Sequence, residues 1–134
     1  GRDAFDLTVC NPPYGKAGRS FFEEPDARSI ARHEILCTLS DCVSSAAQLT
    51  RSGGSVCFVC PALRVAELFA LFSAHRLAVK RVRTVHPRYG APPSVLLVEG
   101  VKGGKPGAAW LSPLFLTDGA GNMTRECREA YHMD

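Results

Sequence analysis

Apolar and polar side chains alternate at the start of the chain. From Phe5–Cys10, aromatic or aliphatic residues alternate with polar residues or cysteine, which is the period-two pattern of a β-strand. The strand is predicted to end at Asn11, because the two prolines that follow it fix φ and restrict the residue before them. Residues 15–29 are predicted to form a loop.

Two helices and a second strand follow in the pattern. Over residues 30–50 apolar side chains recur with helical spacing, and the Ser-Gly-Gly run after them is typical of a helix end. Residues 55–60 are almost wholly apolar, β-branched or aromatic, as expected for a strand covered on both faces. A second helix is predicted over residues 62–75, because its apolar residues lie on one side.

The last regular elements predicted are two strands over residues 77–86 and 94–101. A connection rich in proline joins them and is short enough for an antiparallel hairpin. This order of elements is that of the second half of a doubly wound α/β sheet, in which ligands lie beyond the carboxyl ends of the strands. We expect residues 1–134 to form a single domain, with 103–134 as a tail of little regular structure.

Composition narrows the class of protein. The chain is 46% hydrophobic with a net charge of +3. It contains no apolar run of membrane-spanning length, and its first residues do not resemble a signal peptide, so a cytoplasmic protein without a membrane segment is expected.

Six cysteines are present. Cys57 and Cys60 would point to opposite faces of a strand, and His33 with Cys37 gives two metal ligands, too few for zinc. Reduced thiols are therefore expected, with no metal.

Positive charge gathers in one predicted strand and the turns beside it. The residues concerned are His75, Arg76, Lys80, Arg81, Arg83, His86 and Arg88. Contacts to phosphates explain such a cluster, but edge strands also carry Lys and Arg as a protection against aggregation. Arg81, Arg83 and Arg88 are candidate RNA contacts, and Tyr89 would either stack on a base or fill the hairpin.

The segment Asn11-Pro12-Pro13-Tyr14 resembles the N-P-P-Y motif of class I S-adenosylmethionine-dependent amino-methyltransferases, which lies at the end of their fourth strand. A narrower resemblance covers most of the chain, through Ala31-Arg32-His33-Glu34, Val85-His86-Pro87-Arg88 and the glycine-rich segment 102–107. These segments together resemble the bacterial family that methylates N6 of an adenine beside the anticodon of valine tRNA. The resemblance implies the carboxyl half of a Rossmann-like sheet that ends in an antiparallel hairpin, S-adenosylmethionine as cofactor and tRNA as partner.

The motif's residue types suit the methylation of an amine. A purine amine is a poor nucleophile because its lone pair is delocalised into the ring. If the Asn11 side-chain oxygen and the Pro12 carbonyl accept the two amine hydrogens, the lone pair can turn towards the sulfonium methyl. Pro13 would hold these acceptors apart and Tyr14 would stack on the substrate. On this resemblance Asn11 also borders the cofactor. The plain structural alternative is a Pro-Pro turn with an Asn cap.

Two further residues are assigned by the narrower resemblance alone. Arg32 and His33 would border the substrate cleft. For His33 the alternative is a capping or surface residue on an amphipathic helix, because a lone histidine says little about function.

One feature of that family is missing. Class I enzymes bind the cofactor mainly through a glycine turn after the first strand and an acidic residue after the second, and no strand followed by Gly-x-Gly and a helix occurs in this sequence. We therefore expect the chain to be the carboxyl half of the enzyme, with its open sheet edge covered by the missing amino half or by a second copy. Two alternatives stay open: methylation of a protein glutamine amide (N5), and a non-catalytic RNA-binding half-domain.

Overall fold

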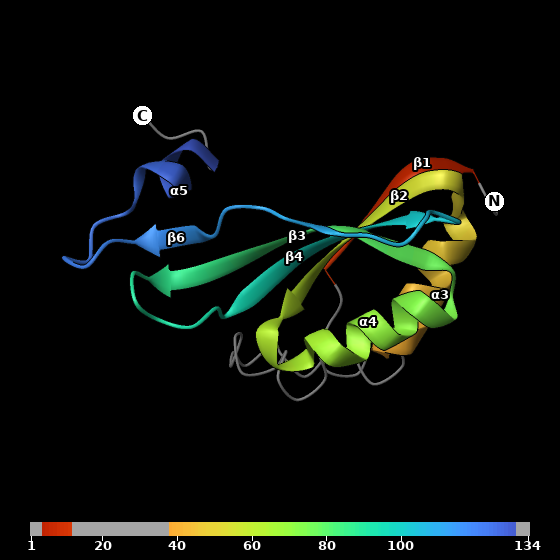
Figure 1. Ribbon diagram of the computed structural model, residues 1–134, viewed down its shortest axis with the longest axis horizontal. Helices are drawn as coiled ribbons and strands as arrows, with labels where there is room; N and C mark the ends of the chain where they lie inside the picture. Colours follow the sequence, from red (N-terminus) through yellow and green to blue (C-terminus); the bar gives the residue numbers. More distant parts are fainter. Residues whose placement is uncertain (1–3, 12–37, 131–134) are drawn as a thin grey trace, which may run out of the picture.

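The computed structural model describes residues 4–11 and 38–130. A six-stranded mixed sheet forms its centre, and α3 (Leu39–Leu49) and α4 (Val65–Ala74) lie on one face of that sheet (Figure 1). Within the described ranges no helix covers the opposite face of the first two strands (Figure 1). None of the described helices has the length and apolar character needed to cross a membrane.

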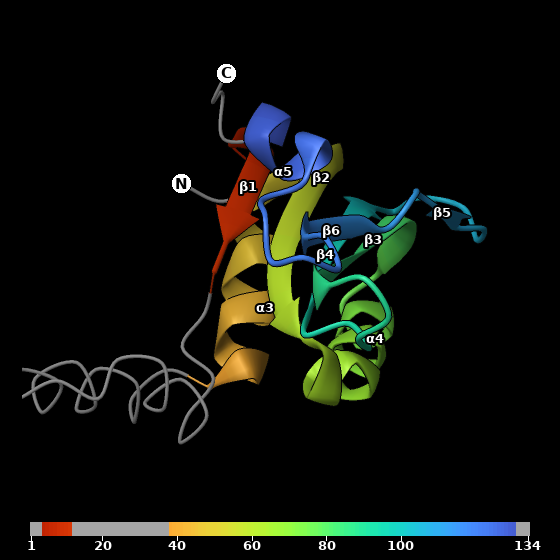
Figure 2. The same ribbon diagram turned by 90° about the vertical axis from the view of Figure 1, so that its left-hand side faces the viewer.

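Four long strands set the topology: β1 (Phe5–Cys10), β2 (Thr50–Pro61), β3 (Leu77–Arg88) and β4 (Val95–Lys102). β1 and β2 are parallel, whereas β4 lies between β2 and β3 and is antiparallel to both. The predicted hairpin of β3 and β4 is confirmed. Because β4 reverses direction between them, β1, β2 and β3 all end at the same edge of the sheet, and Figure 2 shows β1 at one side of this order.

A capping box begins α3. The Thr38 hydroxyl accepts a hydrogen bond from the Asp41 amide at 3.0 Å, and the Asp41 carboxylate accepts one from the Thr38 amide at 3.1 Å. Such reciprocal bonds satisfy donors that the first helical turn leaves open. This helix therefore begins at Leu39, after the Thr38 cap. The start that the apolar spacing predicted, near residue 30, lies among residues 12–37, outside the described ranges.

The alternation of burial along β2 shows which face of the sheet is covered. Val56, Phe58 and Cys60 are almost completely buried, whereas Cys57 and Val59 on the other face are half-buried. The prediction of a strand covered on both faces is therefore wrong for the described residues. An apolar run is compatible with a strand covered on one face or on both faces. The run does not distinguish them, because the elements that cover a strand are remote from it in sequence.

The apolar side of β1 lies on the uncovered face. Leu7 pairs with Ser55, and Val9 pairs with Cys57 on the half-buried side of β2. Exposed fractions are 55% for Leu7 and 68% for Val9, and Phe5 is 50% exposed. The alternation correctly predicted a strand, but its apolar residues do not enter the core that the described residues form.

Gly100 of β4 makes room for a buried ring of α4. A Cβ at this position would lie 2.7 Å from Cε2 of Phe72. Phe72 is fully buried and packs edge-on against Phe58, with ring centroids 5.4 Å apart. The absence of a side chain at Gly100 therefore lets α4 approach the sheet closely.

Short elements follow the hairpin. β5 (Ala109–Trp110) and β6 (Leu114–Thr117) both run parallel to β3, and α5 (Arg125–Ala130) contacts β6. The sequence pattern predicted little regular structure after residue 103. Strands of two and four residues are too short to give a detectable alternation.

Candidate functional site

Asn11 lies at the edge of the sheet where β1 and β2 both end. Cys10, the last residue of β1, pairs with Phe58 of β2, and Asn11 follows it with an exposed side chain. This is the edge at which α/β sheets bind their ligands. The other predicted site residues of the first part of the chain, Pro12, Pro13, Tyr14, Arg32 and His33, lie outside the described ranges.

The connection after β2 lies at the same edge. The short helix η1 (Ala62–Arg64) joins β2 to α4, and its Leu63 is 97% exposed. Arg64 makes an ion pair with Glu67 in the first turn of α4, with a separation of 2.8 Å. Sequence reasoning did not single out Leu63, although it shares with Asn11 a position just after the end of a strand.

The β3–β4 hairpin extends past the ends of β1 and β2, and Figure 1 shows it beside β6 and α5. The Tyr89 ring lies edge-on to Phe115 with centroids 5.0 Å apart, and the His86 ring lies 4.8 Å from that same ring. His86 Nδ1 is 2.8 Å from the Ala91 carbonyl oxygen. These contacts hold the hairpin against β6 and leave Tyr89 49% exposed, next to the exposed Arg88.

Arg81 and Arg83 lie on the uncovered sheet face and not at the hairpin tip. Arg81 forms two hydrogen bonds with Glu99, Nε to Oε1 at 2.6 Å and Nη2 to Oε2 at 2.9 Å. The hydrogen bonds from Arg81 lower the pKa of Glu99 against the opposing effect of partial burial. Arg83 Nε donates to the Ser112 carbonyl at 2.9 Å. The structure thus separates these two arginines from the other predicted RNA contacts.

Most arginines and lysines of the described residues fall into two groups. Ion pairs join Arg51 to Asp6, Arg64 to Glu67, Arg81 to Glu99 and Arg125 to Glu129. Six others have no carboxylate partner among the described residues: Arg76, Lys80, Arg83, Arg88, Lys105 and Arg128. All but Arg128 lie on β3 or on segments beside it, so the uncompensated charge concentrates along this strand, a distribution that attracts phosphates.

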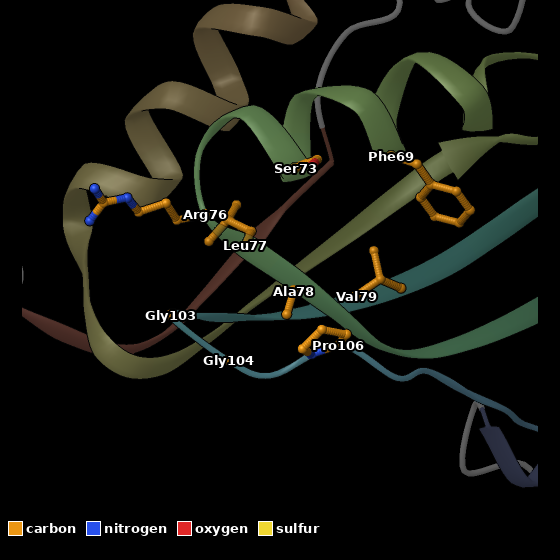
Figure 3. Close-up of a pocket in the computed structure, with 9 residues that line it drawn as sticks. All are labelled: Phe69, Ser73, Arg76, Leu77, Ala78, Val79, Gly103, Gly104 and Pro106. Atoms are coloured by element: carbon orange, nitrogen blue, oxygen red, sulfur yellow. The ribbon is translucent and has the colours of Figure 1, made fainter.

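A pocket of about 480 Å³ lies at the start of β3. Figure 3 shows Phe69 of α4, Val79 of β3 and Pro106 around it, with the Arg76 guanidinium directed away from Pro106. Its lining is mainly apolar. Because β1 and β3 run in the same direction, the pocket lies at the opposite edge of the sheet from Asn11.

The five described cysteines, Cys10, Cys42, Cys57, Cys60 and Cys127, are free thiols. Cys57 is half-buried on the uncovered face. Burial raises the pKa of its thiol, the nearby Glu99 carboxylate adds to this, and Arg81 opposes it. Cys57 is therefore protonated and weakly nucleophilic at neutral pH.

Two curated proteins match the chain in sequence. Both are tRNA1(Val) (adenine(37)-N6)-methyltransferases, from two strains of Porphyromonas gingivalis, and they are 32% and 31% identical to it over 100 residues. The match covers 74% of this chain and 38% of each relative, so the chain spans well under half of their length. No family model matches the chain.

Solved structures of methyltransferases share the fold. A predicted O-methyltransferase from Agrobacterium tumefaciens superposes with a TM-score of 0.68 at 22% identity, covering 92% of this chain and 49% of that one. A protein from Thermus thermophilus, assigned as a DNA modification methylase, superposes with a TM-score of 0.50 at 14% identity. The match covers 96% of this chain and 53% of that one. At these identities the likeness shows the fold, and the shared part is about half of each methyltransferase.

The strand order agrees with the carboxyl half of the methyltransferase sheet, which the sequence resemblance predicted. Two parallel strands with their helices precede a hairpin whose last strand is antiparallel, as expected for the carboxyl half of a class I methyltransferase sheet. The chain therefore has the fold of that carboxyl half, and over 100 residues it is similar in sequence to part of the two Porphyromonas gingivalis tRNA1(Val) (adenine(37)-N6)-methyltransferases.

Proposed function

We propose that this chain supplies the amine-binding half of an S-adenosylmethionine-dependent methyltransferase that modifies N6 of an adenine in tRNA. The position of Asn11, the first residue of the Asn-Pro-Pro-Tyr motif, is the main support. Asn11 leaves β1 at the ligand-binding edge of a methyltransferase half-sheet. The names of the two sequence relatives, which are tRNA adenine-N6 methyltransferases, support the proposed substrate class.

The proposed chemistry depends on two acceptors in the motif. The Asn11 side-chain oxygen and the Pro12 carbonyl accept the two hydrogens of the adenine amine, which draws the nitrogen towards tetrahedral geometry and directs its lone pair. S-adenosylmethionine supplies a methyl group on a sulfonium sulfur. As the nitrogen–carbon bond forms, the carbon–sulfur bond breaks, and the amine then loses one proton to water.

Tyr14 and the hairpin are proposed to hold the RNA. Tyr14 stacks on the adenine ring. Such stacking does not select one base, because every base has a planar π-face. Arg88 and the half-exposed Tyr89 contact the RNA beyond the target nucleotide, where the uncompensated charge of β3 reaches the hairpin. Arg32 and His33 are proposed to border the same cleft.

Among the described residues, Asn11 is the one that we propose to contact the cofactor. Asn11 is exposed where both the methyl donor and the amine must lie. The glycine turn and the ribose-binding carboxylate of class I enzymes have no counterpart in the sequence pattern. We infer that this part of the cofactor site comes from residues outside this chain.

A substrate comparison tests the proposal. The intact gene product is incubated with methyl-labelled S-adenosylmethionine and, separately, tRNA, duplex DNA and a release-factor protein. The expected result is label in tRNA, recovered as N6-methyladenosine after digestion. Label on a release-factor glutamine would instead identify an amide methyltransferase, and tRNA binding without any label would indicate a non-catalytic RNA-binding domain.

A further inference from the structure

Trp110 is the single tryptophan of the chain, and it lies at the outer edge of the sheet. It belongs to β5, which pairs with β3 on the side of the sheet opposite to β1 (Figure 2). Trp110 is 66% exposed, whereas tryptophans are on average highly buried in folded proteins. An exposed indole in an ordered strand is typical of a contact surface, since tryptophan is enriched where proteins bind their partners.

Two side chains of β3 hold the segment that carries Trp110. Lys80 Nζ donates a hydrogen bond to the Lys105 carbonyl at 3.0 Å, before β5. Arg83 Nε donates to the Ser112 carbonyl at 2.9 Å, after β5. The backbone is therefore fixed on both sides of Trp110 while its ring stays exposed. Holding the ring in place lowers the conformational entropy lost when a ligand binds to it.

The strand register places Trp110 on the same face as the aromatic contacts of the hairpin. Trp110 pairs with Val82, and Phe115 pairs with His86. Val82 and His86 are four positions apart in β3, so they and their partners lie on one face of the sheet, about 13 Å apart along the strand. The half-exposed Tyr89 ring lies edge-on to Phe115. A row of aromatic rings therefore runs from Trp110 to the hairpin tip.

The charge beside this aromatic row is mainly positive. Lys80 and Lys105 near Trp110, and Arg88 at the hairpin end, have no carboxylate partner among the described residues. The carboxylates that the structure describes are engaged elsewhere, in ion pairs, in the capping box of α3 or in the turn after β6: Asp6, Glu67, Glu99, Glu129, Asp41 and Asp118. Exposed rings beside unpaired cations suit single-stranded nucleic acid, because the rings stack on bases and the cations contact phosphates.

Trp110 lies too far from the proposed amine site to contact the same nucleotide. One cross-strand row of paired positions runs from the end of β1 to β5: Cys10, Phe58, Val98, Val82 and Trp110. Neighbouring strands are about 4.8 Å apart, so this row spans about 19 Å. Asn11 directly follows Cys10. A base stacked on Trp110 therefore belongs to a nucleotide other than the one whose amine Asn11 binds.

We propose that Trp110 stacks on an unpaired base of the tRNA away from the methylated adenine, while Lys105 contacts a phosphate beside that base. The row from Trp110 to Tyr89 accommodates a single strand on the order of four nucleotides, the low end of the site sizes of stacking surfaces. Trp110 positions the RNA and takes no part in the chemistry. This inference rests on the proposed function, because it takes tRNA as the substrate.

Tryptophan fluorescence of the 134-residue chain reports on this site alone, because Trp110 is its only tryptophan. The probes are single-stranded oligoadenylate of about eight nucleotides and the same strand annealed to oligouridylate. The single strand should quench the fluorescence to saturation, because its bases are free to stack on the indole. The duplex should quench much less at equal occupancy. Unchanged fluorescence with bound single strand, or equal quenching by both probes, would contradict stacking.

Substitutions in the intact gene product separate stacking from charge and from apolar packing. Trp110→Ala should raise the Kd for valine tRNA about tenfold and leave the slope of log K against log salt unchanged. Lys105→Gln should lower that slope by about one unit. Trp110→Tyr should keep most of the affinity, whereas Trp110→Leu should bind as weakly as Trp110→Ala, because leucine has no π-face. Leu49→Ala on α3, where Leu49 is 37% exposed, is the control and should bind like the wild type.

Two results with these variants would overturn the proposal: wild-type tRNA affinity in Trp110→Ala, and wild-type affinity in Trp110→Leu, which would indicate an apolar contact. Circular dichroism verifies that each variant is folded. The proposed function fails separately. Single-stranded RNA that quenches Trp110, together with tRNA that acquires no methyl group, would contradict the methylation and support the stacking site. Methylation of tRNA with a wild-type KM in Trp110→Ala would contradict the stacking site alone.

Discussion

Asn11 illustrates what local sequence can reveal about a catalytic site. Its proposed role depends on neighbours in the chain, because two consecutive prolines after it are expected to restrict the backbone that would carry the second acceptor. The motif therefore predicted chemistry without any knowledge of the fold. The structure adds that Asn11 is exposed at the shared end of β1 and β2.

Replacing Asn11 tests its proposed role in the intact gene product. Asn11→Ala should reduce the single-turnover rate of methyl transfer to tRNA by about two orders of magnitude or more, as expected for the loss of a positioned acceptor. Cofactor affinity should change little. Gln48→Ala, which removes an exposed amide from α3, is the control and should keep the wild-type rate. Near-normal turnover of Asn11→Ala would rule out the proposed role.

The arginines of β3 show where residue-level prediction stops. In the sequence Arg81, Arg83 and Arg88 form one basic group. In the structure Arg81 is bound by Glu99, which lies on a neighbouring strand and 18 positions away. No local pattern indicates such a pairing, so the sequence could not separate the compensated arginine from the uncompensated ones.

Removal of the Arg88 charge tests the RNA-binding assignment. Arg88→Gln should weaken tRNA binding, and the slope of log K against log salt should fall by about one unit, because one phosphate contact is lost. The control is Arg51→Gln, in which the removed cation is paired with Asp6 at the start of the sheet. Equal slopes for Arg88→Gln and the wild type would indicate that Arg88 only protects an exposed turn.

At the level of elements, periodicity predicted which segments form the long strands and helices. It did not predict the start of β2, which begins at Thr50 and contains the Ser-Gly-Gly run that was expected to end the helix. β1 and the β3–β4 hairpin lie where alternation placed them, because their patterns are long and bounded by prolines. The start of α3 was misplaced, since apolar spacing continues before the Thr38 cap. β5 and β6 form by pairing with β3, an interaction between segments that a local pattern does not contain.

The contact between α4 and β4 depends on Gly100. Gly100→Ala should lower the free energy of unfolding by about 1–3 kcal/mol, because the new methyl group would overlap the Phe72 ring. Adding Phe72→Leu should recover part of the loss relative to Phe72→Leu alone. Gly119→Ala, where no atom lies within 4 Å of the added carbon, is the control in urea unfolding. Equal effects at the two glycines would exclude close packing as the cause.

At the scale of the whole molecule, the sequence predicted the fold class and the half-domain, and the topology and the comparisons agree. The insertion of β4 between β2 and β3 is a long-range pairing that local reasoning did not specify. The bare face was also unforeseen. The apolar run of residues 55–60 predicts burial on both sides, whereas among the described residues helices cover one side only and leave Cys57 and Val59 half-buried on the other.

The central claim is that this chain binds the methyl acceptor, whereas most contacts to the methyl donor come from a complementary half. Titration calorimetry of S-adenosylmethionine into the purified 134-residue chain tests this most directly. The proposed division predicts no measurable saturation up to about 1 mM cofactor, equivalent to binding weaker than about −4 kcal/mol. Micromolar binding by the monomeric chain would contradict it and would place the cofactor site within these residues.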